Sequence, residues 1–270
     1  VIFWSSGILK DVLTLGALGV FFGGAWDLLV KRRRIVSSLI WMAIGAYLLY
    51  TIKPYILLIF VPAMVLLIFT MFSHNIRNLQ MRRIAFVFLL VIGAGAGFLM
   101  FQNLTSGSEL ERFSSEQMLE SIKNQRSVYE SEIMQTRSGS SFSLGTTNPI
   151  LALPMGIVAS YFRPFPWELS SPIMLLNIAE SMFFVFLLLY TTQKLGFLNM
   201  LRKLTGNPLA LFCLIFCMLF GMAVGTSTGN FGSLVRYKIP GMAFYVLMFF
   251  IILHQEKIKL PNFFKRIGLN

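Results

Sequence analysis

Seven apolar runs, each close to the length needed to cross a lipid bilayer, constrain this chain more than any other feature. A transmembrane helix needs about 20 apolar residues, or somewhat fewer when flanking side chains snorkel to the interface. The seven runs lie near 12–30, 36–52, 55–72, 84–101, 172–192, 208–225 and 240–254. Only 13% of the residues are charged, whereas a soluble domain has roughly 25%. We therefore predict an all-α integral membrane protein with about seven transmembrane helices.

The distribution of Lys and Arg between the apolar runs predicts the orientation of the chain. Fourteen of the 23 cations lie in the segments 31–34, 77–83, 194–203 and 257–266, which alternate along the chain with the segments of the opposite side. The positive-inside rule assigns these four segments to the cytoplasm. The same rule accounts for the net charge of +12, so we exclude nucleic acid as a partner. The chain begins at Val1 without a signal-peptide pattern, and we expect that an N-terminal portion is missing.

We predict three parts in the chain. Residues 1–101 form a four-helix transmembrane part, residues 102–171 form a periplasmic loop, and residues 172–270 form a three-helix transmembrane part with a basic cytoplasmic tail. In the long outer loop, residues 108–137 carry a broken apolar stripe at helical spacing, which predicts an amphipathic helix resting on the membrane. The run 149–162 is too short and too interrupted by proline to span, so we expect it to re-enter the membrane or to lie along its outer surface.

Several ionisable side chains lie at the membrane boundary on the outer side, where the positive-inside rule requires few cations. Charges at this depth cost free energy unless they are paired, hydrated or used in function. Structural interpretations are a helix cap, the end of a helical hairpin or an interfacial anchor. A functional interpretation is a shared binding site. The side chains concerned are the cations Lys10, Lys53, Arg163, Arg236 and Lys238, and the carboxylates Asp11 and Glu168.

Five cations against two carboxylates predict a pocket for an anionic ligand. The diphosphate of a lipid-linked saccharide needs several Lys or Arg donors when it is partly desolvated. Glycosyl transfer from such a lipid also needs a carboxylate that accepts the proton of the acceptor hydroxyl, for which Glu168 and Asp11 are the candidates. Trp167, with Tyr237 or Trp4, would contact the sugar ring. The sequence requires no cofactor and contains no metal-binding pattern, although a divalent cation between carboxylate and diphosphate is an alternative.

Four stretches of the chain together resemble those of a known group of proteins. The stretches 3–11, 53–55, 163–168 and 230–240 look like segments of polytopic proteins from bacterial surface-polysaccharide gene clusters. These proteins are similar to O-antigen or oligosaccharide-repeat polymerases and to C-type membrane glycosyltransferases. The Arg-Tyr-x-x-Pro element at Arg236, Tyr237 and Pro240 resembles the element that opens a late helix in lipid-dependent sugar transferases. In C-type enzymes the key acid lies in an early outer loop, which would precede Val1 in this chain.

The resemblance implies a glycosyltransferase of the bacterial inner membrane that uses a polyprenyl-diphosphate-linked saccharide at the periplasmic face, beside partner proteins of a polysaccharide assembly pathway. Two other functions remain alternatives. A transporter or flippase of an anionic lipid-linked saccharide would bind it near the bilayer midplane and often shows repeated halves, whereas these charges cluster at one boundary and no repeat is visible. A non-catalytic membrane subunit of an envelope assembly would use the outer loop to dock a partner.

Overall fold

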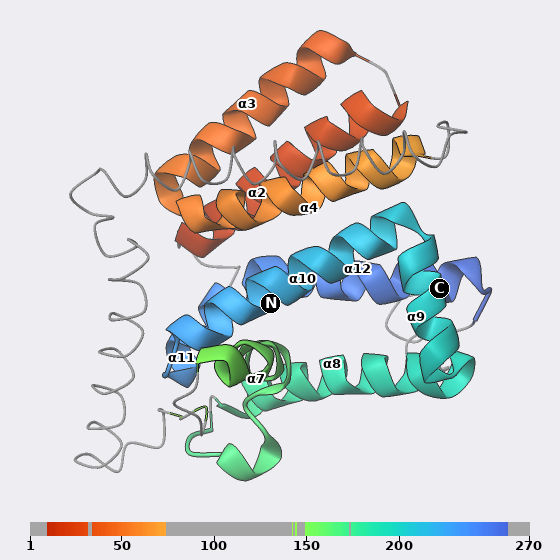
Figure 1. Ribbon diagram of the computed structural model, residues 1–270. Coiled ribbons are helices and arrows are strands. Elements are labelled where there is room, and N and C mark those ends of the chain that lie inside the picture. The colour runs from red at the N-terminus through yellow and green to blue at the C-terminus, as the bar shows by residue number, and fades with distance from the viewer. Residues whose placement is uncertain are drawn as a thin grey trace.

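The described part of the chain consists of helices joined by short turns. The structure, a computed structural model, describes residues 10–31, 34–73, 142, 144, 149–172 and 174–258. No strand occurs within these ranges. The α-helices (Figure 1) are α2 (Lys10–Trp26), α3 (Ile35–Ile52), α4 (Pro54–Ser73), α7 (Pro149–Phe162), α8 (Met174–Leu195), α9 (Phe197–Gly206), α10 (Pro208–Ser227), α11 (Phe231–Tyr237) and α12 (Ile239–Gln255). A π-helical turn, η1 (Asp27–Lys31), continues α2, and a 3-10 turn, η3 (Pro166–Glu168), precedes α8.

Five of these helices are long and apolar enough to cross a membrane. They are α2 with its continuation, α3, α4, α8 and α10, and they correspond to five of the predicted runs. The last predicted run, 240–254, falls within α12, which follows α11 after a bend of 57° and makes a sixth span if the bent pair is counted as one. The predicted run 84–101 and the predicted surface helix 108–137 lie outside the described residues. The membrane class is therefore confirmed, and the number seven stays a prediction.

The helices pack in three layers. Figure 1 shows the group of α2, α3 and α4 against α10 and α12, with α7 and α8 on the opposite side, and the contacts between α4 and α10 and between α12 and α8 agree with this order. Phenylalanine rings fill the space between the first two layers: Phe60 of α4 lies 5.3 Å from Phe212 and 5.4 Å from Phe216 of α10, between ring centroids. The two predicted transmembrane parts of the chain thus share one core.

Small residues allow α7 to approach α10 closely. A Cβ atom built on Gly225 of α10 would lie 2.0 Å from the carbonyl oxygen of Gly156 of α7, so only glycine fits there. One turn earlier in α10, Gly221 faces the ring of Tyr161, and its carbonyl oxygen accepts a hydrogen bond from Ser160 at 2.8 Å. Small residues one turn apart are a common device for close helix contact in membranes. The contacts run in opposite directions along the two helices, so α7 and α10 are antiparallel. Re-entry of the run 149–162 into the membrane stays a prediction.

The two ends of the bundle carry different sets of residues. One end, which we call the Lys53 end, contains the start of α2, the turn between α3 and α4, the segment 163–168 and α11; the other, the α9 end, contains η1 and α9 (Figure 1). Lys53 alone separates α3 from α4, so these two helices form a tight hairpin. Every described segment that we assign to the cytoplasm from its charge is at the α9 end, and the segments that we assign to the outer face are at the Lys53 end.

Candidate functional site

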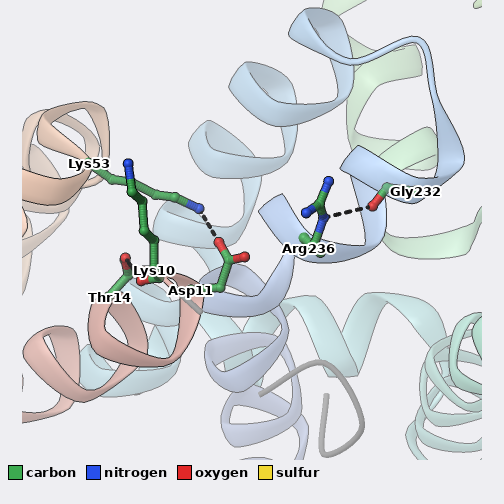
Figure 2. Close-up of polar contacts among 6 residues, drawn as sticks. All are labelled: Lys10, Asp11, Thr14, Lys53, Gly232 and Arg236. Carbon is green, nitrogen blue, oxygen red and sulfur yellow. Dashed lines mark hydrogen bonds and ion pairs between the residues drawn. The ribbon is translucent and has the colours of Figure 1, made fainter. Parts of the chain in front are cut away.

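An ion pair joins the first turn of α2 to the turn between α3 and α4. Lys53 donates a hydrogen bond to the Oδ1 atom of Asp11, and the two side chains are only 11% and 10% exposed. The ammonium group of Lys53 also lies 4.8 Å from the ring centroid of Tyr237 in α11, within the range of a cation–π interaction. Among the described residues, Lys53 is the one hydrogen-bond partner of the Asp11 carboxylate. These contacts bring three segments of the chain together. Figure 2 shows the pair of Lys53 and Asp11.

Two further predicted cations lie at the same end and are accessible. Lys10 precedes Asp11 on α2 and is exposed, since neighbouring helix residues point about 100° apart. Arg236 of α11 is half-buried, and its Nε atom donates a hydrogen bond to the carbonyl oxygen of Gly232 at 3.3 Å (Figure 2). Within the part of the chain that the structure describes, neither side chain forms an ion pair. Both retain charged hydrogen-bond donors for a ligand.

The segment 163–168 closes on itself through its two charged residues. The Nε atom of Arg163 donates to the Oε1 atom of Glu168 at 2.9 Å, and a second contact joins Nη2 to the same oxygen. The backbone N–H of Phe165 donates to the Oε2 atom of Glu168 at 2.8 Å. Because Arg163 and Glu168 are five residues apart, the pairing is local, and Pro164 and Pro166 restrict the backbone between them. Both carboxylate oxygens of Glu168 are therefore engaged in holding this loop.

Aromatic rings surround the Arg163 guanidinium group. Its Cζ atom lies 4.5 Å from the ring centroid of Phe142 and 5.6 Å from that of Phe231 at the start of α11. The two rings stack on each other with their centroids 4.8 Å apart. This environment orients the guanidinium group by cation–π attraction in addition to its ion pair. Neither Phe142 nor Phe231 is in our sequence-based set of site residues, although Phe231 belongs to the stretch 230–240 that carries the resemblance.

Lys238, at the bend between α11 and α12, is fully buried. Its ammonium group donates to the hydroxyl oxygen of Ser181 in α8 at 3.2 Å and to the carbonyl oxygen of Arg163 at 3.4 Å. Ser181 donates to the same carbonyl oxygen at 2.8 Å. Glu180, in the preceding position of α8, interacts electrostatically with Lys238. Lys238 thus ties the bend to the segment that carries Arg163, and its own charge faces the interior rather than the solvent.

The predicted sugar-contacting residues lie at the same end. Trp167 is 77% exposed, and its indole stacks on the ring of Phe165 at a centroid distance of 4.7 Å. Tyr237 is 39% exposed beside Lys53, and Trp4 lies outside the described residues. Exposed aromatic rings held by a neighbouring ring are suited to stacking on a flat apolar face, including that of a sugar.

Helix α11 connects the two clusters of charged residues. Tyr237 contacts Lys53, Phe231 contacts Arg163, and Lys238 immediately after the helix binds the Arg163 carbonyl. The predicted site residues from four separate stretches are therefore brought to one end of the bundle. Sequence reasoning missed the internal pairing of Lys53 and Arg163 with the two carboxylates, and it missed Ser181, a small polar residue within an apolar run.

The fold and the distribution of apolar helices define a multi-pass membrane protein. No family model, curated protein or solved structure matches the chain. In the described ranges, no cluster of three or more His, Cys, Asp or Glu side chains has the arrangement to hold a metal ion.

Proposed function

We propose that the protein is a membrane glycan polymerase or lipid-linked sugar transferase, and that the Lys53 end binds the diphosphate of a polyprenyl-diphosphate-linked saccharide. The observation that supports this proposal is the convergence, around α11, of five cations and two carboxylates from stretches far apart in the sequence. Glu180 of α8 lies beside Lys238 and balances its charge. The other four cations and the two carboxylates leave an excess of two positive charges, which suits an anionic lipid headgroup at a membrane boundary. On this proposal, the site faces the periplasm of a bacterial inner membrane, as the positive-inside rule predicts.

The contacts divide the five cations into three kinds. Lys10 and Arg236 are accessible and would bind the phosphate oxygens first. Lys53 and Arg163 already hold carboxylates and would share their donors with the diphosphate. Lys238 is buried, so we assign it a positioning role, which is to hold the Arg163 segment against the bend rather than to touch the ligand.

The same contacts favour Asp11 over Glu168 as the catalytic base. Glu168 accepts hydrogen bonds on both oxygens and holds the loop 163–168. Asp11 is held by Lys53, and phosphate oxygens that compete for Lys53 would free the Asp11 carboxylate when the donor binds. In the transfer step, the acceptor hydroxyl oxygen bonds to the anomeric carbon as the bond from that carbon to the diphosphate oxygen breaks. Asp11 takes the hydroxyl proton, and the cations stabilise the leaving diphosphate.

A transporter fits the geometry less well. Transport sites usually lie near the bilayer midplane, between helices that move relative to one another. The charged groups described above, apart from Glu180 in α8, lie instead at helix ends and in the adjoining turns, at one end of the bundle. An exposed aromatic residue such as Trp167 beside these charges also suits a saccharide that is held for reaction at the membrane surface.

The test is consumption of the donor by purified protein in liposomes. The liposomes receive polyprenyl-diphosphate-linked saccharides extracted from membranes of the source organism, and mass spectrometry follows the release of free polyprenyl diphosphate. We expect release with the wild type and its loss with Asp11→Asn, with folding of the variant checked by thermal melting in detergent. The matched control is Asp27→Asn, which removes a carboxylate from the exposed pair with Lys31 at the α9 end and should leave release unchanged. Donor that crosses the bilayer without being consumed would instead support a transporter.

A further inference from the structure

Helix α9 connects two spanning helices at the α9 end of the bundle. It follows α8 after Gly196, whose φ of 77° suits glycine, and it ends at Asn207, whose side chain caps α10 by accepting hydrogen bonds from the N–H groups of Leu209 and Ala210. Figure 1 shows α9 running across the direction of α8 and α10. Because α8 ends and α10 begins at this level, α9 lies where the spanning segments leave the membrane.

The side chains of α9 are arranged in three sectors around its axis. Met200 and Leu204, one turn apart, are each 3% exposed and pack into the core. Next to them, Phe197, Leu198 and Leu201 are 61%, 69% and 41% exposed. At about 100° per residue, the remaining sector holds Asn199, Arg202 and Lys203, all of which are exposed. The protein core therefore covers only some of the apolar side chains of α9, and the others remain exposed.

The charges around the exposed apolar sector are positive. Arg202 borders this sector on α9, and Lys194 is exposed in the last turn of α8. Lys203 is held by Glu256 at 2.6 Å, and α9 itself contains no acidic residue. An exposed apolar stripe bordered by cations is the pattern of a helix that lies in the plane of a membrane surface that contains anionic lipids.

We infer that α9 is an interfacial helix that binds anionic phospholipid headgroups. Phe197, Leu198 and Leu201 insert into the boundary between headgroups and acyl chains, while Arg202 and Lys194 bind the lipid phosphates. This inference is independent of the proposed function, because it concerns the opposite end of the bundle. The acyl chains of an anionic phospholipid match the exposed apolar side chains, and its phosphate matches the exposed cations.

Spin labels on adjacent faces of α9 test the depth of the helix. Leu198→Cys and Asn199→Cys are labelled separately in the protein reconstituted in phosphatidylcholine vesicles, where the native Cys213 and Cys217 are buried and remain unlabelled. Collision with oxygen and with a water-soluble nickel chelate reports lipid and water contact. We expect the label at 198 to favour oxygen severalfold more than the label at 199. A label at 198 that is as accessible to the nickel chelate as the label at 199 would overturn the insertion of α9.

A change of lipid composition tests the preference for anionic headgroups. Adding phosphatidylglycerol to the vesicles should reduce the mobility of the label at 198 in the wild type, and this effect should disappear in a Lys194→Gln, Arg202→Gln double variant. The matched control is Lys31→Gln, which removes an exposed cation at the same end but outside α9. If phosphatidylglycerol leaves the mobility of the wild-type label unchanged, or if the double variant responds as the wild type does, α9 has no specific site for anionic lipid. Because all of these side chains are exposed, unchanged thermal melting is the expected sign that the variants fold.

Discussion

Replacing Lys53 by methionine should leave the Asp11 carboxylate as an uncompensated charge in a place that is almost closed to water. The two side chains are 11% and 10% exposed, so the pair behaves as a buried ion pair rather than a surface one. Breaking such a pair by removing one partner costs about 3–5 kcal/mol of unfolding free energy. The variant also loses the cation–π contact with Tyr237, which contributes about 0.5–2 kcal/mol. We therefore expect Lys53→Met to lower the unfolding free energy by about 3.5–7 kcal/mol.

The double variant Lys53→Met, Asp11→Leu separates the charge effect from simple loss of contacts. It removes the unpaired carboxylate as well, and replacing both members of a buried pair by apolar residues is often close to neutral. Its expected cost is about 1–2 kcal/mol, mostly from the lost cation–π contact. Equilibrium unfolding in mixed detergent micelles, followed by circular dichroism, measures both of these variants and the single variant Asp11→Leu, which completes the cycle. The same cycle on Asp27 and Lys31, which are 45% and 57% exposed, should give a coupling below about 0.5 kcal/mol. Additive costs at Asp11 and Lys53 would refute the buried pair.

Two further predictions concern the packing of α7 and the exposed indole of the loop 163–168. Gly225→Ala should lower the unfolding free energy by about 1–3 kcal/mol or more, because its Cβ atom would meet the α7 backbone. Gly19→Ala, at a position with open space around it, should change the unfolding free energy by less than about 1 kcal/mol. Equal effects of the two substitutions in the same unfolding assay would contradict the close contact. Trp167→Ala should lower the unfolding free energy by at most about 1.5 kcal/mol, since the side chain is 77% exposed and loses only its stacking on Phe165. It should weaken binding of a lipid-linked saccharide but not of farnesyl diphosphate, which has no sugar; parallel losses for both ligands would argue against a sugar contact.

The helices were largely predictable from the sequence because their causes are local. Spanning length and apolar composition fix α3, α4 and α10, and proline marks the starts of α4 and α10. The alternation of Lys- and Arg-rich segments along the chain also predicted which of the described loops lie together at one end of the bundle. The bend of 57° between α11 and α12 lies at Lys238, which reaches across to Ser181 of α8, a contact that no local pattern identifies.

The contacts within the candidate site were much less predictable. Lys10 and Asp11 are adjacent in sequence, yet one is exposed and the other buried, and the helix phase that decides this depends on packing between α2 and α3. The partner of Asp11 lies 42 residues away, so no local pattern identifies it. The pairing of Arg163 with Glu168 was also missed, although it is local: only four residues, two of them prolines, lie between the two charges.

The most direct test of the central claim is calorimetric titration of the purified protein with farnesyl diphosphate, whose headgroup represents that of the polyprenyl donor. We expect saturable binding that weakens with rising salt concentration, because the donors are charged. Each lost charge-assisted hydrogen bond is worth about 1.5–3 kcal/mol, so Arg236→Gln should raise the Kd roughly 10- to 100-fold. Lys31→Gln, at the opposite end, should leave the Kd unchanged. Absence of binding to the folded wild type, or an Arg236→Gln variant that binds as the wild type does, would contradict the assignment of the Lys53 end as a lipid-diphosphate site.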